Sequence, residues 1–577
     1  MKPSCGAHPR QRPIRVHASR FFTTSRPRFE IARRDAAHNE AIPSAAEHPA
    51  RLPAMPQATD LAQATLLRGR ASLASVPQLW EGVAEREQAL TGHLVPLSTS
   101  EPFHWSSQVC RGASELLQTL QWSGGLSGGL GPVPLLKARQ EFFESLRTTV
   151  FSVSVVVQAR RVVAALASED VALKSDLTIP ADAATLDAFV ATYGDSWVRS
   201  ARIGGEMRGV YTLYAQTREQ AREVATALDL LVSTGTVSLG PTFSRRLKTI
   251  ANDSKVNVRF QVSVSGLAQP PVITEDTMAD FASAFGTLAL DQPEVLSLQT
   301  QGYEDVPALR EVFQPVARNR VQLTGEGSKP GILRQWWRLR ELINQCDWVE
   351  RTYATYGVAQ DPTLAANRER LREDIREIEA LCSRYRDSPS TPLDEPVLEA
   401  FATGSPRLHA PLSDGQVMGG DGGEPFRYLD RENAIRRRRR LVEVGLSSGN
   451  RIDQIRLHYH QEPVGEADEW LTEVHGGGGG ANRGDMELGT GVGLARIEGL
   501  SGVPHGRVDQ LWLTSGDGQR IGGGGDKGNE PIDWRPAPNQ VVLGFSGRAK
   551  AELDSLWVVI ATFGPLAWEP VRVEEDP

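Results

Sequence analysis

The sequence predicts a multidomain protein with an α+β N-terminal domain, a helical connector and an all-β C-terminal domain. Three observations predict this class. The chain of 577 residues is too long for one core, strand-like alternation recurs in its first half, and glycine-rich runs recur near its end. The expected boundaries are 1–54 for a basic segment, 55–325 for the α+β domain, 326–415 for the connector and 416–577 for the all-β domain.

The composition excludes several functional classes. A balance of 63 basic and 71 acidic residues gives a net charge of −8, which provides no general attraction to nucleic acid. The four cysteines have no metal-ligand spacing and do not suggest a disulfide framework. The chain shows no nucleophile–base set and no phosphate loop, so we expect no enzyme, no catalytic residue, no metal and no cofactor. It has no run of 18 apolar residues, so no membrane-spanning helix is expected.

The first segment differs from the rest of the chain. Residues 1–34 contain eight Arg, one Lys and a single acid, and they lack the apolar stretch of a secretory signal. The stretch 20–26 (Arg-Phe-Phe-Thr-Thr-Ser-Arg) resembles a mitochondrial presequence with its processing site. The alternatives are a disordered basic tail, or translation that begins at Met55.

The C-terminal part contains three copies of one unit. Each copy has an Asp turn followed by an apolar or alternating strand, and glycine-rich runs recur in step with these turns. The aspartates are Asp453, Asp509 and Asp554, and the glycine-rich runs are 419–423, 476–480 and 522–525. A low-complexity linker is the alternative for the glycine runs. Linkers do not recur in step with such strands, so we predict an all-β domain.

Two stretches make the pattern more specific. Residues 419–426 (Gly-Gly-Asp-Gly-Gly-Glu-Pro-Phe) open the domain, and residues 543–548 (Leu-Gly-Phe-Ser-Gly-Arg) precede its last Asp turn. Together with the repeats, they resemble the jacalin-related lectins. The resemblance implies a β-prism of three four-stranded Greek keys that binds glycans. In that family a Gly-x-x-x-Asp loop and a facing Gly-Gly loop hold sugar hydroxyls without a metal.

The resemblance implies three candidate sugar sites of unequal quality. The first keeps the motif intact, and its residues are Gly449, Asp453, Gly476 and Gly477. The second has His505 in the motif's Gly position, with a glycine one place late, and its residues are Gly506, Asp509, Gly522 and Gly523. The third has Lys550 in the motif's Gly position, and its residues are Asp554, Gly419 and Gly420. We therefore rank the Asp453 site first. A prism that serves only as a docking surface is the alternative.

The N-terminal half contains a second spaced motif. A helix ending at Tyr193 is expected, because Leu186, Phe189 and Val190 fit one face. Strand patterns follow at 197–203 and 209–214, with further strands expected at 151–157 and 256–264. The motif itself consists of Tyr193, Gly194, Trp197, Gly204 and Gly205. Its spacing resembles the signature of the membrane-attack-complex/perforin family, with Asp195 and Ser196 where that family has Thr and His.

This resemblance implies a bent antiparallel sheet flanked by two helical clusters that unfurl into membrane hairpins. Residues 106–150 and 216–255 are each long enough for two membrane strands of ~9–11 residues and a turn. The alternative is that these segments are stable helices of a non-lytic relative.

Two further features concern the connector. Residues 331–388 are expected to form two helices that pack on the large domain as a hairpin, with a coiled-coil partner surface as the less favoured alternative. The basic run 436–440 is expected to be a solvated strand edge, with contact to anionic lipid as the alternative.

Together these features predict a lectin-guided protein of the pore-forming type. Glycans are the expected partners, with a lipid membrane and a homo-oligomeric ring as further ones, and no nucleic acid. The alternative is a non-lytic carbohydrate-binding or interaction protein with the same architecture.

Overall fold

The computed structural model describes the chain in segments. These are 55–71, 84–97, 103–120, 142, 145–215, 217–233, 241–326, 329–398, 404–428, 431, 434–461, 469–502 and 506–570. The basic segment 1–54, with its presequence-like stretch, lies outside them, as do His505 and, within the expected hairpin segments, residues 121–141 and 234–240.

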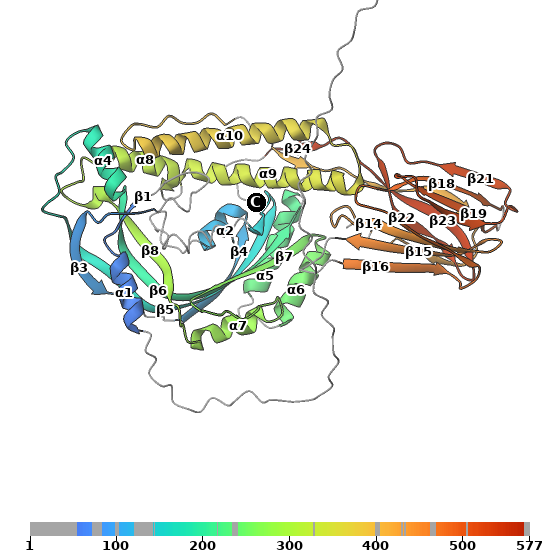
Figure 1. Cartoon of the computed structure of the whole chain (residues 1–577), viewed down its shortest axis with the longest axis horizontal. Coiled ribbons are helices and arrows are strands. Elements are labelled where there is room, and N and C mark those ends of the chain that lie inside the picture. The colour runs from blue at the N-terminus through green and yellow to red at the C-terminus, as the bar shows by residue number, and fades with distance from the viewer. Residues whose placement is uncertain are drawn as a thin grey trace, which may run out of the picture. The chain divides into compact units, whose positions relative to one another are not determined.

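Two long strands form the centre of the large sheet. They are β5 (Ser152–Leu173) and β6 (Ser196–Tyr214), which pair antiparallel and curve through the domain (Figure 1). The two strand patterns expected on either side of the glycine pair therefore belong to one continuous strand. The other strands of this sheet are β1 (Gly69–Ala71), β2 (Ala84–Arg86), β3 (Leu90–Pro96), β4 (Phe103–Arg111), β7 (Asn257–Ser265) and β8 (Glu294–Gly302).

The long strands change partners at the glycine pair. β8 pairs with β6 as far as Gly204, and β7 pairs with it from Glu206 onward. On the other side, β4 pairs with residues 153–161 of β5, and β3 with residues 166–173. The register between β5 and β6 shifts between Val162 and Ala164, opposite the same place. A bulge bends and twists a strand, so the bend and the change of partner coincide there.

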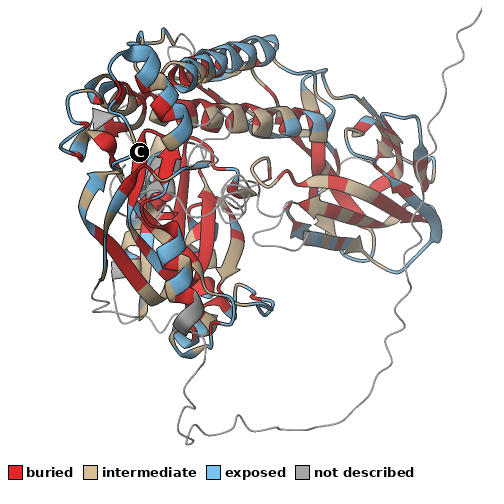
Figure 2. Cartoon of the chain, turned by 60° about the vertical axis from the view of Figure 1, so that its left-hand side comes forward, coloured by how far each residue is buried: buried red, intermediate tan, exposed pale blue. Residues whose placement is uncertain are grey.

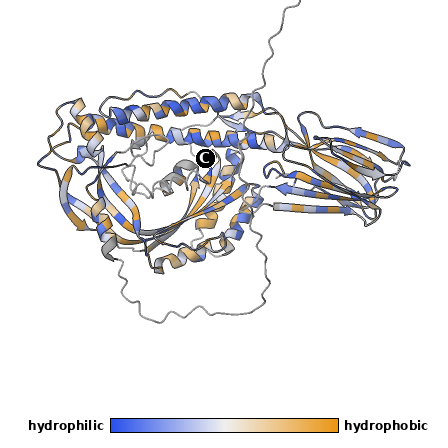
Figure 3. Ribbon diagram, viewed as in Figure 1, coloured by the Kyte–Doolittle hydropathy of each residue, from blue (hydrophilic) through white to orange (hydrophobic). Residues whose placement is uncertain are grey.

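Helices cover both faces of this sheet. The alternate residues Val153, Val155 and Val157 of β5 pack into one core with α5 (Arg218–Ser233) and α6 (Pro241–Asp253). Val156 instead packs with α2 (Ala113–Leu120) on the opposite face. This two-sided burial explains the nearly continuous apolar run in β5. Figures 2 and 3 show the buried and the apolar residues concentrated on these strands.

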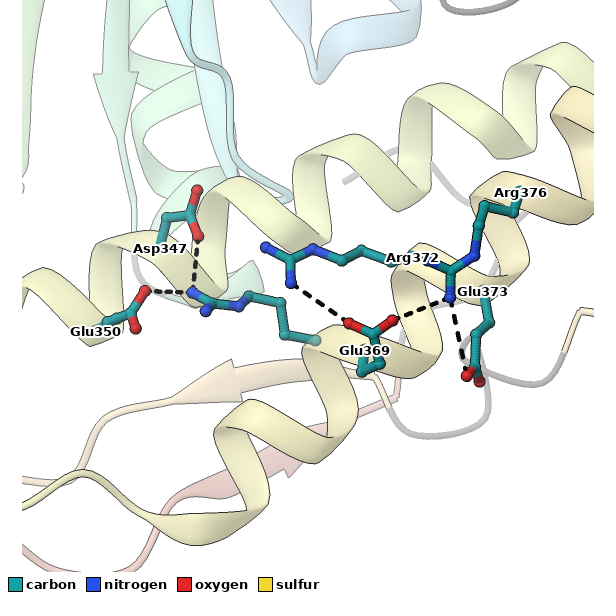
Figure 4. Close-up of polar contacts among 7 residues, drawn as sticks. Asp347, Glu350, Glu369, Arg372, Glu373 and Arg376 are labelled. Carbon is teal, nitrogen blue, oxygen red and sulfur yellow. Dashed lines mark hydrogen bonds and ion pairs between the residues drawn. The ribbon is translucent and has the colours of Figure 1, made fainter. Parts of the chain in front are cut away.

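The expected helix pair is present as α9 (Ile332–Tyr356) and α10 (Pro362–Asp387). Asp361 caps α10, and Pro362 occupies its first turn, where a missing N–H is harmless. Arg368 of α10 forms ion pairs with Asp347, at 3.3 Å, and Glu350 of α9. Figure 4 shows these pairs next to the exposed ladder that joins Glu369, Arg372, Glu373 and Arg376 within α10. None of the described helices is long and apolar enough to cross a membrane.

The remaining elements connect these parts. The helix expected to end at Tyr193 is α4 (Ala183–Tyr193), and it buries Leu186, Phe189 and Val190, as the sequence pattern predicted. The others are α1 (Met55–Thr65), α7 (Met278–Ala284), α8 (Gln314–Thr324), β9 (Gly325–Glu326), β10 (Lys329–Pro330), β11 (Ser405–Arg407) and β24 (Ala567–Glu569).

The C-terminal part contains three antiparallel sheets of four strands each. Their strand orders are β12-β23-β22-β13, β16-β15-β14-β17 and β20-β19-β18-β21. The last two have the 3-2-1-4 order of a Greek key, and the first is completed by strands from the two ends of the domain. The bounds are β12 Leu412–Gly419, β13 Glu424–Phe426, β14 Arg440–Ser448, β15 Ile452–Gln461, β16 Glu469–Gly476, β17 Ala481–Glu487, β18 Leu494–Ser501, β19 Val508–Ser515, β20 Arg520–Gly524, β21 Glu530–Trp534, β22 Gln540–Ala549 and β23 Leu553–Thr562. This is the expected β-prism.

The prediction of a solvated edge for the basic run 436–440 was wrong. Arg438 and Arg439 are only 7% and 4% exposed. The Arg438 guanidinium lies over the Trp348 ring of α9, at 5.9 Å, and burial together with Arg351 lowers its pKa to about 10. The Arg439 side chain donates to the Gln461 side chain at 2.7 Å. Arg438 therefore joins the prism to α9, whereas Arg439 is held within the prism.

Candidate functional site

Each sheet of the prism contains one loop that leads into an aspartate. Asp453, Asp509 and Asp554 are each the second residue of β15, β19 and β23. The register leaves residues 449–451 and 550–552 in the first and third loops. The second loop spans 502–507 and is three residues longer than the others. The three aspartates therefore hold equivalent strand positions behind loops of unequal length.

A glycine with positive φ faces each aspartate. Gly419, Gly476 and Gly524 have φ values of 88°, 103° and 104°, and a Cβ on any of them would overlap the facing aspartate's carbonyl oxygen. The next glycine in each run donates its N–H to that same carbonyl at 2.9 Å. The facing pairs are Asp554 with Gly419 and Gly420, Asp453 with Gly476 and Gly477, and Asp509 with Gly524 and Gly525. The conformation and the close approach together require glycine here.

The structure corrects the expected partners of Asp509. Gly522 and Gly523 lie inside β20, paired with Trp512 and Leu511. Gly524 and Gly525 take the facing position instead, because β20 continues to Gly524 before it turns. The sequence pattern alone gave no signal for where the strand ended.

The motif glycine of the second site is also different from the expected one. Gly502 directly follows β18, just as Gly449 follows β14, and an added Cβ on either would lie 3.6 Å from the facing Asp Oδ2. Gly506 packs against the Gly502 backbone across the longer loop. The loop has three extra residues, so the motif glycine does not lie four residues before Asp509 as the Gly-x-x-x-Asp spacing requires.

Glycines form a cradle around two of the carboxylates. A Cβ on Gly479 or Gly480 would overlap the two carboxylate oxygens of Asp453, and Gly422 and Gly423 stand in the same relation to Asp554. The Gly449 N–H donates to Asp453 Oδ2 at 2.7 Å. The cradle thus brings backbone to the carboxylate with no side chain between them.

Lys550 does not change how the third loop closes. Its N–H donates to the Glu552 carbonyl at 3.0 Å, and the Gly449 N–H donates to the Arg451 carbonyl at the same distance. The Lys550 side chain is exposed. The replacement of the motif glycine by Lys550 therefore gives no reason to rank the third site lower.

Two arginines distinguish the sites instead. Arg451 Nε lies 3.5 Å from Asp509 Oδ1, and Arg507 Nε lies 3.6 Å from Asp554 Oδ1. Among the described residues, no cation lies within ion-pair distance of Asp453. Both arginines also bind Glu552, Arg451 at 3.0 Å. They lower the pKa of that carboxyl, against the effect of its partial burial.

Sequence reasoning missed these three residues, although a signal was present. Arg451, Arg507 and Glu552 each lie two positions before a site aspartate. This position carries Arg in two repeats and Glu in the third, so the sign of its charge differs among the repeats.

Comparison with known proteins assigns the prism. The family model of the jacalin-like lectin domain matches residues 416–559. The prism is a jacalin-like lectin domain. A search of curated proteins found no match for the chain.

Several solved lectins resemble this domain. A mannose-binding jacalin-related lectin from Ananas comosus is 21% identical, covers 26% of this chain and 96% of its own, and has a TM-score of 0.22. Malaysian banana lectin is 21% identical, with 27% and 99% coverage and a TM-score of 0.21. Artocarpin in complex with Me-α-mannose is 19% identical, with 26% and 97% coverage and a TM-score of 0.21.

In the N-terminal mixed α/β region, the residues of the spaced motif lie where strands and helices pack closely together. The Tyr193 carbonyl accepts from the Tyr303 hydroxyl at 3.0 Å, and Trp197 is buried. A Cβ on Gly194 would overlap the Arg70 backbone of β1, and one on Gly204 would overlap the Arg161 carbonyl of β5. Gly205 lies against Gly266. These residues fix the close approach of the strands to one another and to α4.

Asp195 joins this region to the helices. It is 1% exposed, and its Oδ2 accepts from the Tyr385 hydroxyl of α10 at 2.7 Å. Arg320 of α8 donates to the Asp195 carbonyl at 2.8 Å and pairs with Glu304. Burial lowers the pKa of Arg320, but the Asp195 and Glu304 charges outweigh this effect and leave it raised. Asp195 therefore anchors two helices at the edge of the sheet.

Proposed function

We propose that the jacalin-like lectin domain binds a neutral glycan at Asp453. One difference among the three carboxylates carries this proposal. Asp509 and Asp554 each have a guanidinium beside them, whereas no guanidinium among the described residues lies beside Asp453. An ionised carboxylate accepts strong hydrogen bonds from two adjacent sugar hydroxyls. The glycine cradle lets the ring approach the backbone. Mannose binding is stated for one of the similar lectins, which makes mannosides suitable first probes.

Asp453→Ala is expected to weaken glycan binding by about 10- to 100-fold, because it removes charge-assisted hydrogen bonds of about 1.5–3 kcal/mol. Asp554→Ala is the matched control, since it has the same chemistry in a cradle already occupied by Arg507. Binding of both variants and the wild type to a glycan array measures the difference. Equal losses, or a larger loss with Asp554→Ala, would reverse the ranking of the sites.

We further propose that the N-terminal region is a perforin-like domain that the lectin domain brings to glycan-bearing membranes. This is supported by the two long paired strands, the signature spacing and the change of strand partners at the glycine pair. α5 and α6 connect β6 to β7, and their 16 and 13 residues each exceed the ~9–11 residues of a membrane strand. Binding to a surface raises the local concentration of this domain and favours a ring of subunits.

One observation favours a non-lytic relative instead. Arg222 and Glu223 are adjacent in α5. Successive residues of a strand face opposite sides, so an extended form of α5 would place one of these charges against lipid. Such a charge is unfavourable by roughly 2–4 kcal/mol at the bilayer midplane for a basic residue. In this second reading, the protein binds glycans and partners without opening the membrane.

Dye release from liposomes separates these functions. We expect release from vesicles carrying mannosylated lipid, and much less from vesicles without it, because attachment through Asp453 comes first. Asp453→Ala is the control, and it should release no more dye from mannosylated vesicles than the wild type releases from vesicles without mannose. Binding of the wild type to the mannosylated vesicles without release, and without rings in electron micrographs, would leave the non-lytic function.

Catalysis forms no part of this proposal. Among the described residues, no group of three His, Cys, Asp or Glu side chains is placed to hold a metal ion. We propose a binding role with no cofactor.

A further inference from the structure

The three sugar loops of the prism contact one another in a cycle. The Asn450 carbonyl of the first loop accepts from Gly525 N–H of the Asp509 cradle at 3.1 Å. The equivalent residue of the third loop, Ala551, places its carbonyl against Gly477 of the Asp453 cradle. The first and third loops therefore lean on the cradle of the neighbouring repeat, and the second loop reaches its neighbour through Arg507, which lies beside Asp554.

The residue after the contact differs in charge among the repeats. Arg451 follows Asn450 and reaches Asp509, and Arg507 reaches Asp554 in the same way. Glu552 follows Ala551, so the third loop carries an acid at the position where the other two loops carry an arginine. Glu552 also holds both arginines, because its Oε2 binds Arg451 and Arg507.

We propose that Glu552, Arg451 and Arg507 form an ion-pair network, here called the relay, that leaves one sugar pocket open and closes the other two. The arginines occupy the carboxylates that sugar hydroxyls would need, and Glu552 keeps them there. The third loop brings no guanidinium to Asp453, and the negative charge of Glu552 repels anionic sugars. The open pocket is therefore selective for neutral pyranosides. This inference rests on the proposed glycan binding.

Titration calorimetry of the full-length protein tests the relay. The probes are methyl α-mannoside, methyl α-glucoside and methyl α-galactoside, with glucuronic acid as the anionic comparison. We expect one site per chain for at least one neutral probe and none for glucuronic acid. Arg507→Ala should raise the stoichiometry to two, because the Asp554 cradle matches that of Asp453 glycine by glycine. Arg507→Gln tests the same point if the alanine variant is unstable.

The reverse change should close the open pocket. Glu552→Arg gives the third loop the guanidinium that Arg451 and Arg507 supply in the other two loops, and it should lower affinity at least tenfold. Arg520→Ala is the matched control, since Arg520 pairs with Glu498 on a sheet outside the three loops. It should leave both stoichiometry and affinity unchanged.

The possible failures are distinguishable. If neither the wild type nor any variant binds a probe, both the glycan function and the relay are overturned. If the wild type binds one neutral sugar and Arg507→Ala and Arg507→Gln still show one site, only the relay is overturned. Three equal sites in the wild type would also reject the relay while supporting the lectin function.

Discussion

Gly204→Ala is expected to lower the free energy of unfolding by about 3 kcal/mol, the upper end of the usual effect of overpacking. An added Cβ would overlap the Arg161 carbonyl, which belongs to the paired strand β5. A backbone atom held in a sheet cannot turn aside as a side chain can, so β5 and β6 would have to separate. Urea denaturation followed by tryptophan fluorescence measures the loss.

Gly209→Ala is the matched control on the same strand. Its Cβ would lie 3.0 Å from Met278 Cγ, at the flexible part of a side chain. Methionine adapts readily to such changes, so we expect a loss below about 1 kcal/mol. Equal losses for the two variants would show that the bend does not depend on close approach at Gly204.

Arg320→Met is expected to have a comparable effect, lowering the free energy of unfolding by about 3 kcal/mol. The arginine side chain is 15% exposed and that of its partner Glu304 is 18% exposed. Breaking a buried pair by removing one partner leaves an uncompensated charge. The same substitution also removes the donor to the Asp195 carbonyl, and with it part of the anchor for α8.

Two further variants test the reason for this loss. Arg320→Met combined with Glu304→Leu should recover much of the stability, because an apolar pair can replace a buried ion pair. Arg376→Ala removes two exposed ion pairs within α10 and should leave the unfolding midpoint unchanged. If the double variant were no more stable than Arg320→Met alone, the loss would not come from the stranded Glu304 charge.

Local sequence determined the elements of this fold. The Asp and glycine repeats, α4 and the two connector helices depend on spacing within a few residues, and the structure shows each of them. The partners of Asp509 were assigned incorrectly, because β20 runs to Gly524 and the loop at Gly502 carries three extra residues. Loop length and strand ends depend on pairing with distant strands, which spacing does not encode.

The tertiary structure decided which of the three carboxylates have a guanidinium beside them. In the sequence, Asp453 ranked first because its motif was intact and Lys550 replaced a glycine in the third site. Our proposal keeps that ranking on a different ground, because Lys550 leaves its loop unchanged and Arg507 lies beside the Asp554 carboxylate. Arg438 and Arg439 of the basic run 436–440, which the sequence pattern predicted at a solvated edge, are likewise buried. A charge acts on the groups that folding brings near it, and these partners lie in other repeats or other domains. The sequence by itself therefore determined the three loops, and only the packing of one loop on the next determined which carboxylates have a guanidinium beside them.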